Sequence, residues 1–60
     1  MNLIFKIIME VGQKVKVRID DFEYLGLIIK KDVVNTIYYV SISALSEVIE
    51  SDGSNLTAIN

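Results

Sequence analysis

The sequence contains no cysteine and no histidine. Without cysteine the chain has neither disulfides nor thiolate metal ligands. Without histidine it lacks the commonest metal ligand and the commonest general base of enzymes. The acidic stretch Asp20, Asp21 and Glu23 lacks the spacing and the glycine of a calcium-binding loop. We therefore expect a protein that is not an enzyme and that needs no cofactor and no metal.

Long hydrophobic runs are also missing. The longest apolar stretch, residues 3–9, has Lys6 in its middle and is far shorter than the ~20 residues that a transmembrane helix needs. No charge precedes this stretch and no small-residue cleavage site follows it, so we do not expect a signal peptide. We expect no membrane contact, and the absence of cysteine favours the cytoplasm.

Positive charge is missing from the second half of the chain. All six lysine and arginine residues lie within residues 1–31, whereas residues 32–60 carry four acidic residues and no cation. The chain has a formal net charge of −2 and a pI of about 4.8. Because affinity for nucleic acids comes largely from neutralising phosphates, an acidic total argues against strong general binding of nucleic acid. The pattern instead predicts a molecule with one basic and one acidic side.

Hydrophobic residues, by contrast, are abundant. They make up 52% of the 60 positions and give a mean hydropathy of +0.44. A chain of this length forms one domain at most and buries only ~60% of the surface of its unfolded state. The surplus favours an interface with a partner protein or with a second copy. A tightly filled sheet with two apolar faces is the competing interpretation.

Residues 14–20 give the clearest indication of secondary structure. Val15, Val17 and Ile19 alternate with polar residues, which is the pattern of a half-buried strand. Further along the chain Gly26 lies inside an apolar, β-branched segment, where a glycine often marks a bulge or a strong bend.

Turn-forming and β-favouring segments follow one another through the rest of the chain. In order, we expect a turn at 20–23, a strand at 24–31, a hairpin loop at 32–35, a strand at 36–42, a short helical turn near 43–47, a brief strand or the end of that turn at 47–50, a turn at 52–55 and a last strand at 56–59.

The N-terminal segment, residues 1–8, is apolar on both faces. In a strand, Leu3, Phe5 and Ile7 would line one face, with Ile4 and Ile8 on the other. Such a strand is usually covered on both sides. We expect either a strand added to the sheet or a contact with a second subunit.

Four short stretches occur in an order that is typical of a known class of fold. They are Val11-Gly12-Gln13-Lys14-Val15-Lys16-Val17, then Tyr24-Leu25-Gly26-Leu27-Ile28-Ile29 after an acidic loop, then Tyr38-Tyr39-Val40, and finally Leu45-Ser46-Glu47-Val48. This order resembles an SH3-like barrel of the KOW and Tudor kind over roughly residues 11–51. The resemblance implies one small all-β barrel domain of five to six strands, spanning residues 1–60. Domains of this kind bind proteins, RNA or modified basic residues.

A basic patch is the first candidate site. If residues 20–23 form the turn, Lys14 lies across from about Ile29, and cations gather at one edge of the sheet. The patch consists of Lys14, Lys16, Arg18, Lys30 and Lys31. It would bind phosphate or an acidic protein. The alternative is a solvated strand face, or an edge whose charges prevent aggregation.

Aromatic residues form the second candidate site, a partner-binding surface made of Phe22, Tyr24, Tyr38 and Tyr39. Phe22 stands in an otherwise acidic loop, where it is either tucked under the loop or presented to a partner. In Tudor-like barrels, loop aromatics form a cage for a methylated cation. Packing in the core and between strands is the alternative for each ring.

The first functional hypothesis is a small non-catalytic protein-binding module, of the kind that a phage or mobile element uses as a regulator or inhibitor. The second is a nucleic-acid-binding barrel that uses the basic strand face. The third is a structural subunit of a larger assembly, with Leu3, Phe5 and Ile7 in its interface.

Overall fold

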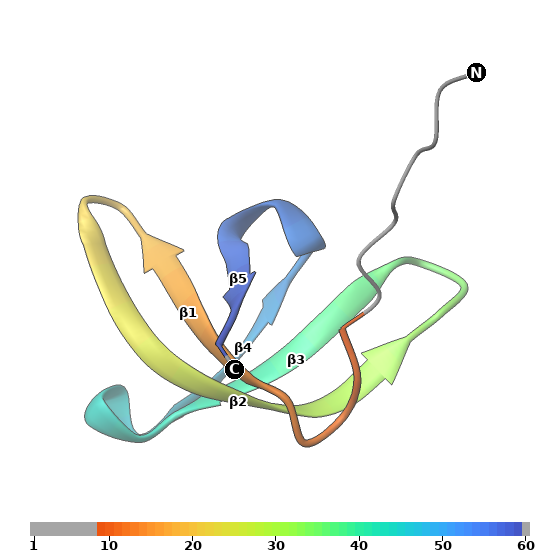
Figure 1. Cartoon of the computed structure of the whole chain (residues 1–60), viewed down its shortest axis with the longest axis horizontal. Helices are drawn as coiled ribbons and strands as arrows, with labels where there is room; N and C mark the ends of the chain where they lie inside the picture. Colours follow the sequence, from red (N-terminus) through yellow and green to blue (C-terminus); the bar gives the residue numbers. More distant parts are fainter. Residues whose placement is uncertain (1–8, 60) are drawn as a thin grey trace.

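A computed structural model describes residues 9–59, which form one antiparallel sheet (Figure 1). Its strands are β1 (Lys14–Ile19), β2 (Phe22–Asp32), β3 (Ile37–Ile42), β4 (Glu47–Ser51) and β5 (Leu56–Ala58), with the 3-10 turns η1 (Ser43–Leu45) and η2 (Gly53–Asn55). The prediction of an all-β fold is confirmed, and the short helical turn expected near 43–47 is η1. Within residues 9–59 no helix has the length and apolar character to cross a membrane.

The predicted strand at residues 1–8 lies outside the described residues. The same holds for the expected interface residues Leu3, Phe5 and Ile7.

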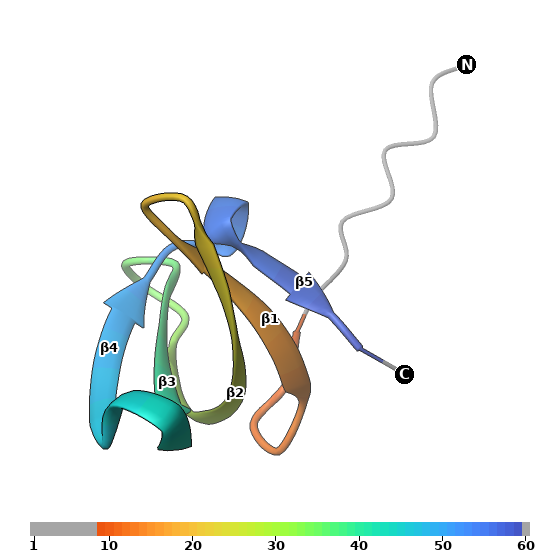
Figure 2. The same cartoon turned by 90° about the vertical axis from the view of Figure 1, so that its left-hand side faces the viewer.

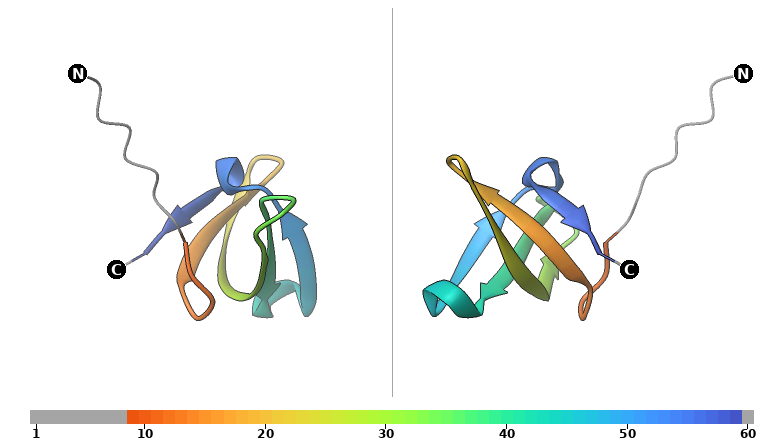
Figure 3. Two further views of the ribbon diagram at one scale, coloured as in Figure 1. Left: turned by 90° about the vertical axis from the view of Figure 1, so that its right-hand side faces the viewer. Right: turned by 60° about the vertical axis from the view of Figure 1, so that its left-hand side comes forward.

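The strands lie in the order β4-β3-β2-β1-β5, as Figure 2 shows from left to right. β1 to β4 form a simple meander, and β5 returns to pair with the free side of β1. The sheet curls, and β4 and β5 lie at its two edges (Figure 3). In the part of the chain that the structure describes, these two strands do not pair with each other, so the sheet is open.

The first hairpin is tighter than predicted. Ile19 pairs with Phe22, which leaves a two-residue loop of Asp20 and Asp21. Asp20 adopts the left-handed conformation with φ 54°, which aspartate tolerates better than most residues. The predicted turn over residues 20–23 is therefore wrong at its second half, because Phe22 and Glu23 belong to β2.

The tight turn also moves the register of β1 against β2. Lys14 lies across from Leu27, so the expectation that it faces Ile29 is wrong by two positions. Because side chains alternate between faces, a shift of two keeps the same face of β1 toward the core.

The second hairpin is closed by one aspartate. β2 ends at Asp32, across from Ile37, and the loop spans residues 33–36. The Asp32 carboxylate accepts hydrogen bonds from the backbone N–H groups of Val34 and Asn35, both at 3.1 Å, and from the Asn35 side chain at 2.9 Å. Such a local bond network is a common way for aspartate to fix a turn.

β2 is long and strongly curved (Figure 1). Gly26 lies across from Val15, on the core side of the strand. An ideal Cβ at this position would lie 2.5 Å from Val40 Cγ1, so only glycine lets the strands approach this closely. The β-bulge falls three residues later, between Ile28 and Lys30. The prediction of a bend is thus confirmed, although the bulge itself is not at Gly26.

The core lies on the inner side of the curled sheet. Its buried members are Met9, Val15, Val17, Ile28, Tyr38, Val40, Ile42 and Leu56. Every strand except β4 contributes at least one of them, and Ile49 of β4 packs against the cluster. The alternation of Val15 and Val17 with exposed residues in β1 agrees with the pattern in the sequence.

The entry to β1 is held by backbone hydrogen bonds. Gln13 N–H donates to the carbonyl of Glu10 at 3.0 Å, and Gly12 in this turn has φ 93°. Positive φ at the third residue is what a type II turn needs. Gln13 also donates from Nε2 to the carbonyl of Ile59 at 3.1 Å, which ties the end of the chain to the start of the sheet.

Candidate functional site

The side of the sheet that faces away from the core is called the outer face here. Side chains alternate along a strand, so the neighbours of the buried Val15, Val17 and Val40 lie on the outer face. The outer-face residues are Lys14, Lys16 and Arg18 of β1, Glu23, Leu25 and Leu27 of β2, Tyr39 and Ser41 of β3, and Val48 and Glu50 of β4.

An apolar row runs along β2 in the middle of this face. Leu25 is 69% exposed, and Leu27 and Ile29 are exposed as well. Ile28 just before Ile29 is fully buried, so Ile29 follows the alternation of β2 onto the outer face. Among the described residues, eight large hydrophobic side chains are exposed, as many as form the core. Isolated exposed hydrophobic side chains are normal on a protein surface, whereas Leu25, Leu27 and Ile29 lie on one face of one strand.

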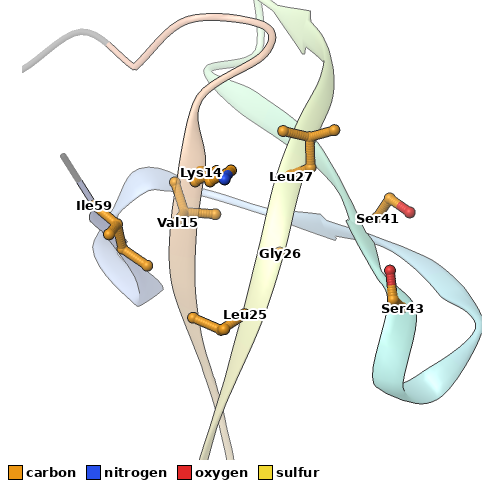
Figure 4. A pocket seen from close by; sticks show the side chains of 8 residues that line it. All are labelled: Lys14, Val15, Leu25, Gly26, Leu27, Ser41, Ser43 and Ile59. Carbon is orange, nitrogen blue, oxygen red and sulfur yellow. The ribbon is translucent and has the colours of Figure 1, made fainter.

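A groove of about 410 Å³ crosses the outer face beside this row (Figure 4). Its lining residues are Lys14, Val15, Leu25, Gly26, Leu27, Ser41, Ser43 and Ile59. Leu25 and Leu27 flank Gly26 along β2, Lys14 and Ile59 lie on one side, and the two serines lie on the other (Figure 4). None of these eight residues is acidic, so the groove suits an apolar group that carries negative charge near it.

The predicted basic patch is only partly assembled. Lys14, Lys16 and Arg18 form an exposed row on the outer face of β1. Lys31 is separated from this row, because it lies across from the buried Tyr38 and bonds Glu10 at 3.3 Å. Lys30 lies over the ring of Tyr39, with its Nζ 5.3 Å from the centroid. Three of the five predicted cations therefore lie together in one row.

The predicted aromatic surface is divided between the two faces. Phe22 and Tyr24 are neighbours, with ring centroids 6.5 Å apart, and Phe22 is 66% exposed. Tyr38 is a buried member of the core, whereas Tyr39 points to the outer face. Phe22 is thus presented rather than tucked under the loop, while the adjacent tyrosines cannot belong to one surface.

Tyr39 lies between charges of opposite sign. The carboxylate of Glu50, across from it on β4, raises the pKa of the Tyr39 hydroxyl, and partial burial acts in the same direction. Lys30 approaches the ring face, where a cation is attracted by the ring's electrons.

Two of the carboxylates in the described residues, those of Asp32 and Asp52, accept hydrogen bonds within turns. Hydrogen bonds from Asn35 lower the pKa of Asp32, and hydrogen bonds from Ser54 lower that of Asp52. Asp52 caps η2 by accepting from the Ser54 backbone N–H at 2.9 Å. Within residues 9–59 no three acidic side chains come together in a group that could hold a metal ion.

Sequence reasoning missed the groove and the apolar row. Leu25, Leu27 and Ile29 were expected in a strand. Their local sequence does not show whether another part of residues 9–59 covers them. The signal that pointed to such a surface was the surplus of hydrophobic residues.

No protein-family model, no curated protein and no solved structure matches this chain.

Proposed function

We propose that this chain is a non-catalytic protein-binding domain whose contact surface is the outer face of the sheet. The observation that carries the proposal is the exposed row of Leu25, Leu27 and Ile29 beside the groove. Fully covering one large aliphatic side chain is worth about 1.5–3 kcal/mol. Covering this row therefore contributes several kcal/mol of favourable binding free energy, which the entropy lost on association partly offsets.

The fold itself supports the same interpretation. We infer that the domain is an open relative of the SH3-like barrels, because β5 returns to β1 after a 3-10 turn and β2 is bent around the core. Small barrels of this kind commonly act as binding modules, but the fold alone does not identify a ligand. The proposed contact surface therefore rests on the exposed residues of the outer face and not on the fold.

Site-specific photo-crosslinking tests the proposal. A benzophenone amino acid at Leu25 should crosslink to a protein in native extract, whereas the same probe at Val34 should not. Val34 is a matched control, because it is 90% exposed but lies in the β2–β3 loop, away from the outer face. A product with twice the mass of the chain identifies a second copy, and any other mass identifies a different protein. Equal labelling at both positions, or no product at Leu25, contradicts the proposal.

A nucleic-acid-binding domain is the second candidate. The exposed row of Lys14, Lys16 and Arg18 favours it, since alternate residues of a strand repeat every ~7 Å and present their charges in a line. The net charge of −2 opposes it. Fluorescence anisotropy with a labelled RNA or DNA at low salt decides this case, and binding should weaken steeply as salt is added. No anisotropy change at low salt excludes it.

A further inference from the structure

We propose that the groove binds a short amphipathic helix of a partner protein, with the apolar side chains of the helix in the groove and its carboxylates facing Lys14 and Lys16. This inference rests on the proposed function and names the chemistry of the partner. It depends on the walls of the groove, on the two lysines beside it, and on the direction of the backbone groups in the sheet.

The walls of the groove select apolar side chains. Leu25 and Leu27 stand on either side of Gly26 along β2 (Figure 4), and Ser41 and Ser43 line the other side without adding charge. A cavity of ~150 Å³ lined by aliphatic residues holds a benzene molecule. The groove of about 410 Å³ therefore has room for two large side chains.

Lys14 and Lys16 supply positive charge on the β1 side of the groove. Both are exposed on the outer face, where they lie across from Leu27 and Leu25 of β2. On the other side of β1, Lys16 lies across from Thr57 of β5. The strand neighbours of the two lysines on this face are thus uncharged, and the complementary ligand carries carboxylates on the flank that faces β1.

The sheet favours a helical ligand over an extended one. The backbone hydrogen bonds of an antiparallel sheet lie in its plane, and Leu27 pairs with Lys14 on one side and with Ser41 on the other. The outer face therefore offers side chains and no backbone partners. An extended segment lying on it would leave its own N–H and C=O groups unpaired where water is excluded, whereas a helix bonds these groups internally.

The spacing of the two lysines fits one turn of such a helix. Alternate residues of a strand are ~7 Å apart, which applies to Lys14 and Lys16 and equally to Leu27 and Leu25 across from them. Residues four apart on a helix are separated by about 5–6 Å. A helix parallel to β1 therefore presents two carboxylates to the lysines and two apolar side chains to the leucines.

A nucleic acid fits this face less well. Phosphates would use the whole basic row of β1, but Arg18 lies across from Glu23, which offsets its charge. A phosphate backbone also has no apolar group to place between Leu25 and Leu27. The apolar walls thus favour a protein ligand.

Stapled peptides test the inference by chemical-shift titration of the nitrogen-15-labelled full chain. The staple is needed because a free peptide of about three turns is barely helical in water. The acidic peptide carries leucines four residues apart, with glutamates on both flanks so that it fits in either direction. One control peptide has lysines in place of the glutamates, and another has glutamines in place of the leucines.

The acidic peptide should bind at least about fivefold more tightly than either control peptide at low salt, because only it satisfies both the lysines and the apolar walls. Its binding should weaken as salt is added. The amide signals that shift should include those of Lys14, Lys16, Leu25 and Leu27.

Charge reversal on the protein gives the second arm of the test. Lys14→Glu should weaken binding of the acidic peptide by about fivefold or more and strengthen binding of the lysine peptide. Lys31→Glu is the matched control, because it makes the same change in net charge but lies across from the buried Tyr38, next to Glu10. It should bind the acidic peptide like the wild type. Circular dichroism checks that both variants are folded.

Three results would overturn the inference: an acidic peptide that shifts no signals of the outer face, a lysine peptide that binds as tightly, or a Lys14→Glu variant that behaves like Lys31→Glu. A single-stranded RNA that displaces the acidic peptide would assign the face to nucleic acid instead.

The photo-crosslinking experiment separates this inference from the proposed function. A Leu25 crosslink to a second copy, or to a segment of another protein without carboxylates, would refute the inference and leave the proposed function standing. The absence of any product at Leu25 contradicts the proposed function itself.

Discussion

Gly26→Ala is expected to lower the free energy of unfolding by about 1–3 kcal/mol, the usual cost of overpacking a core. The added methyl carbon would lie 2.5 Å from Val40 Cγ1 and 3.1 Å from Val17 Cγ2, whereas carbon atoms pack at about 3.5–4.0 Å. Both valines are fully buried and have little free space to move into. A domain of this size has a total stability of about 3–9 kcal/mol, so the loss is a large fraction of it.

Urea denaturation followed by far-ultraviolet circular dichroism measures this effect, with Gly53→Ala as the control. A Cβ at Gly53 would lie 3.6 Å from Met9 Cε and 3.7 Å from Tyr38 Cε2, which are ordinary contacts. Gly53→Ala should therefore be neutral or stabilise by up to ~1 kcal/mol, because alanine restricts the unfolded chain. If Gly26→Ala unfolds at the same urea concentration as the wild type, the packing argument is refuted.

A double-mutant cycle locates the clash. Val40→Ala alone should cost about 2 kcal/mol, for two lost methyl groups and a partly filled cavity. In the double variant, the methyl group added at position 26 occupies the space that Val40 Cγ1 leaves, so the combined cost should be lower than the sum by about 1 kcal/mol. Simple additivity would mean that Val40 is not what excludes a side chain at position 26.

Two further predictions concern the turns. The carboxylate of Asp32 has a pKa below its ordinary 3.8 because of its hydrogen bonds to Asn35, so its stabilisation is present above about pH 3.8 and is lost as the pH falls further. The melting temperatures of the wild type and of Asp32→Asn should differ at pH 7 and converge near pH 2. A difference that stays the same at both pH values would contradict the stabilising role assigned to the Asp32 carboxylate. Gly12→Ala should cost about 1–2 kcal/mol from the positive φ of 93° alone, since its Cβ would meet nothing within 4 Å. Asparagine tolerates positive φ better than alanine, so Gly12→Asn should lower the free energy of unfolding by less in the same urea titration. Equal losses of stability would point to a cause other than φ.

The strands were predictable where the sequence alternates or carries clear turn residues. The segment over residues 14–20 has strict period two, and it forms β1 with Val15 and Val17 in the core. Asp52 and Gly53 predicted a turn, and this turn contains η2 with Asp52 as its cap. In both cases the decisive interactions lie within a few residues of one another.

The register of the first hairpin was not predictable in the same way. Two-residue loops are usually announced by a glycine at the position of positive φ, and here Asp20 takes that conformation instead. The sequence Asp-Asp-Phe-Glu therefore suggested a longer turn, which moved Lys14 two positions along β2. The groove could not be predicted from the sequence for a related reason. Its shape depends on which side chains of β1, β2 and β3 lie next to one another across the sheet.

β1 is held between two neighbours that reach it by very different routes. β2 follows it after a two-residue turn, whereas the bond from Gln13 to Ile59 closes a separation of 46 positions. Long closures cost more entropy and form more slowly than local ones. The hairpins are thus expected to assemble first and β5 to dock last. For the same reason, β5 should be the first strand to detach when the domain opens locally.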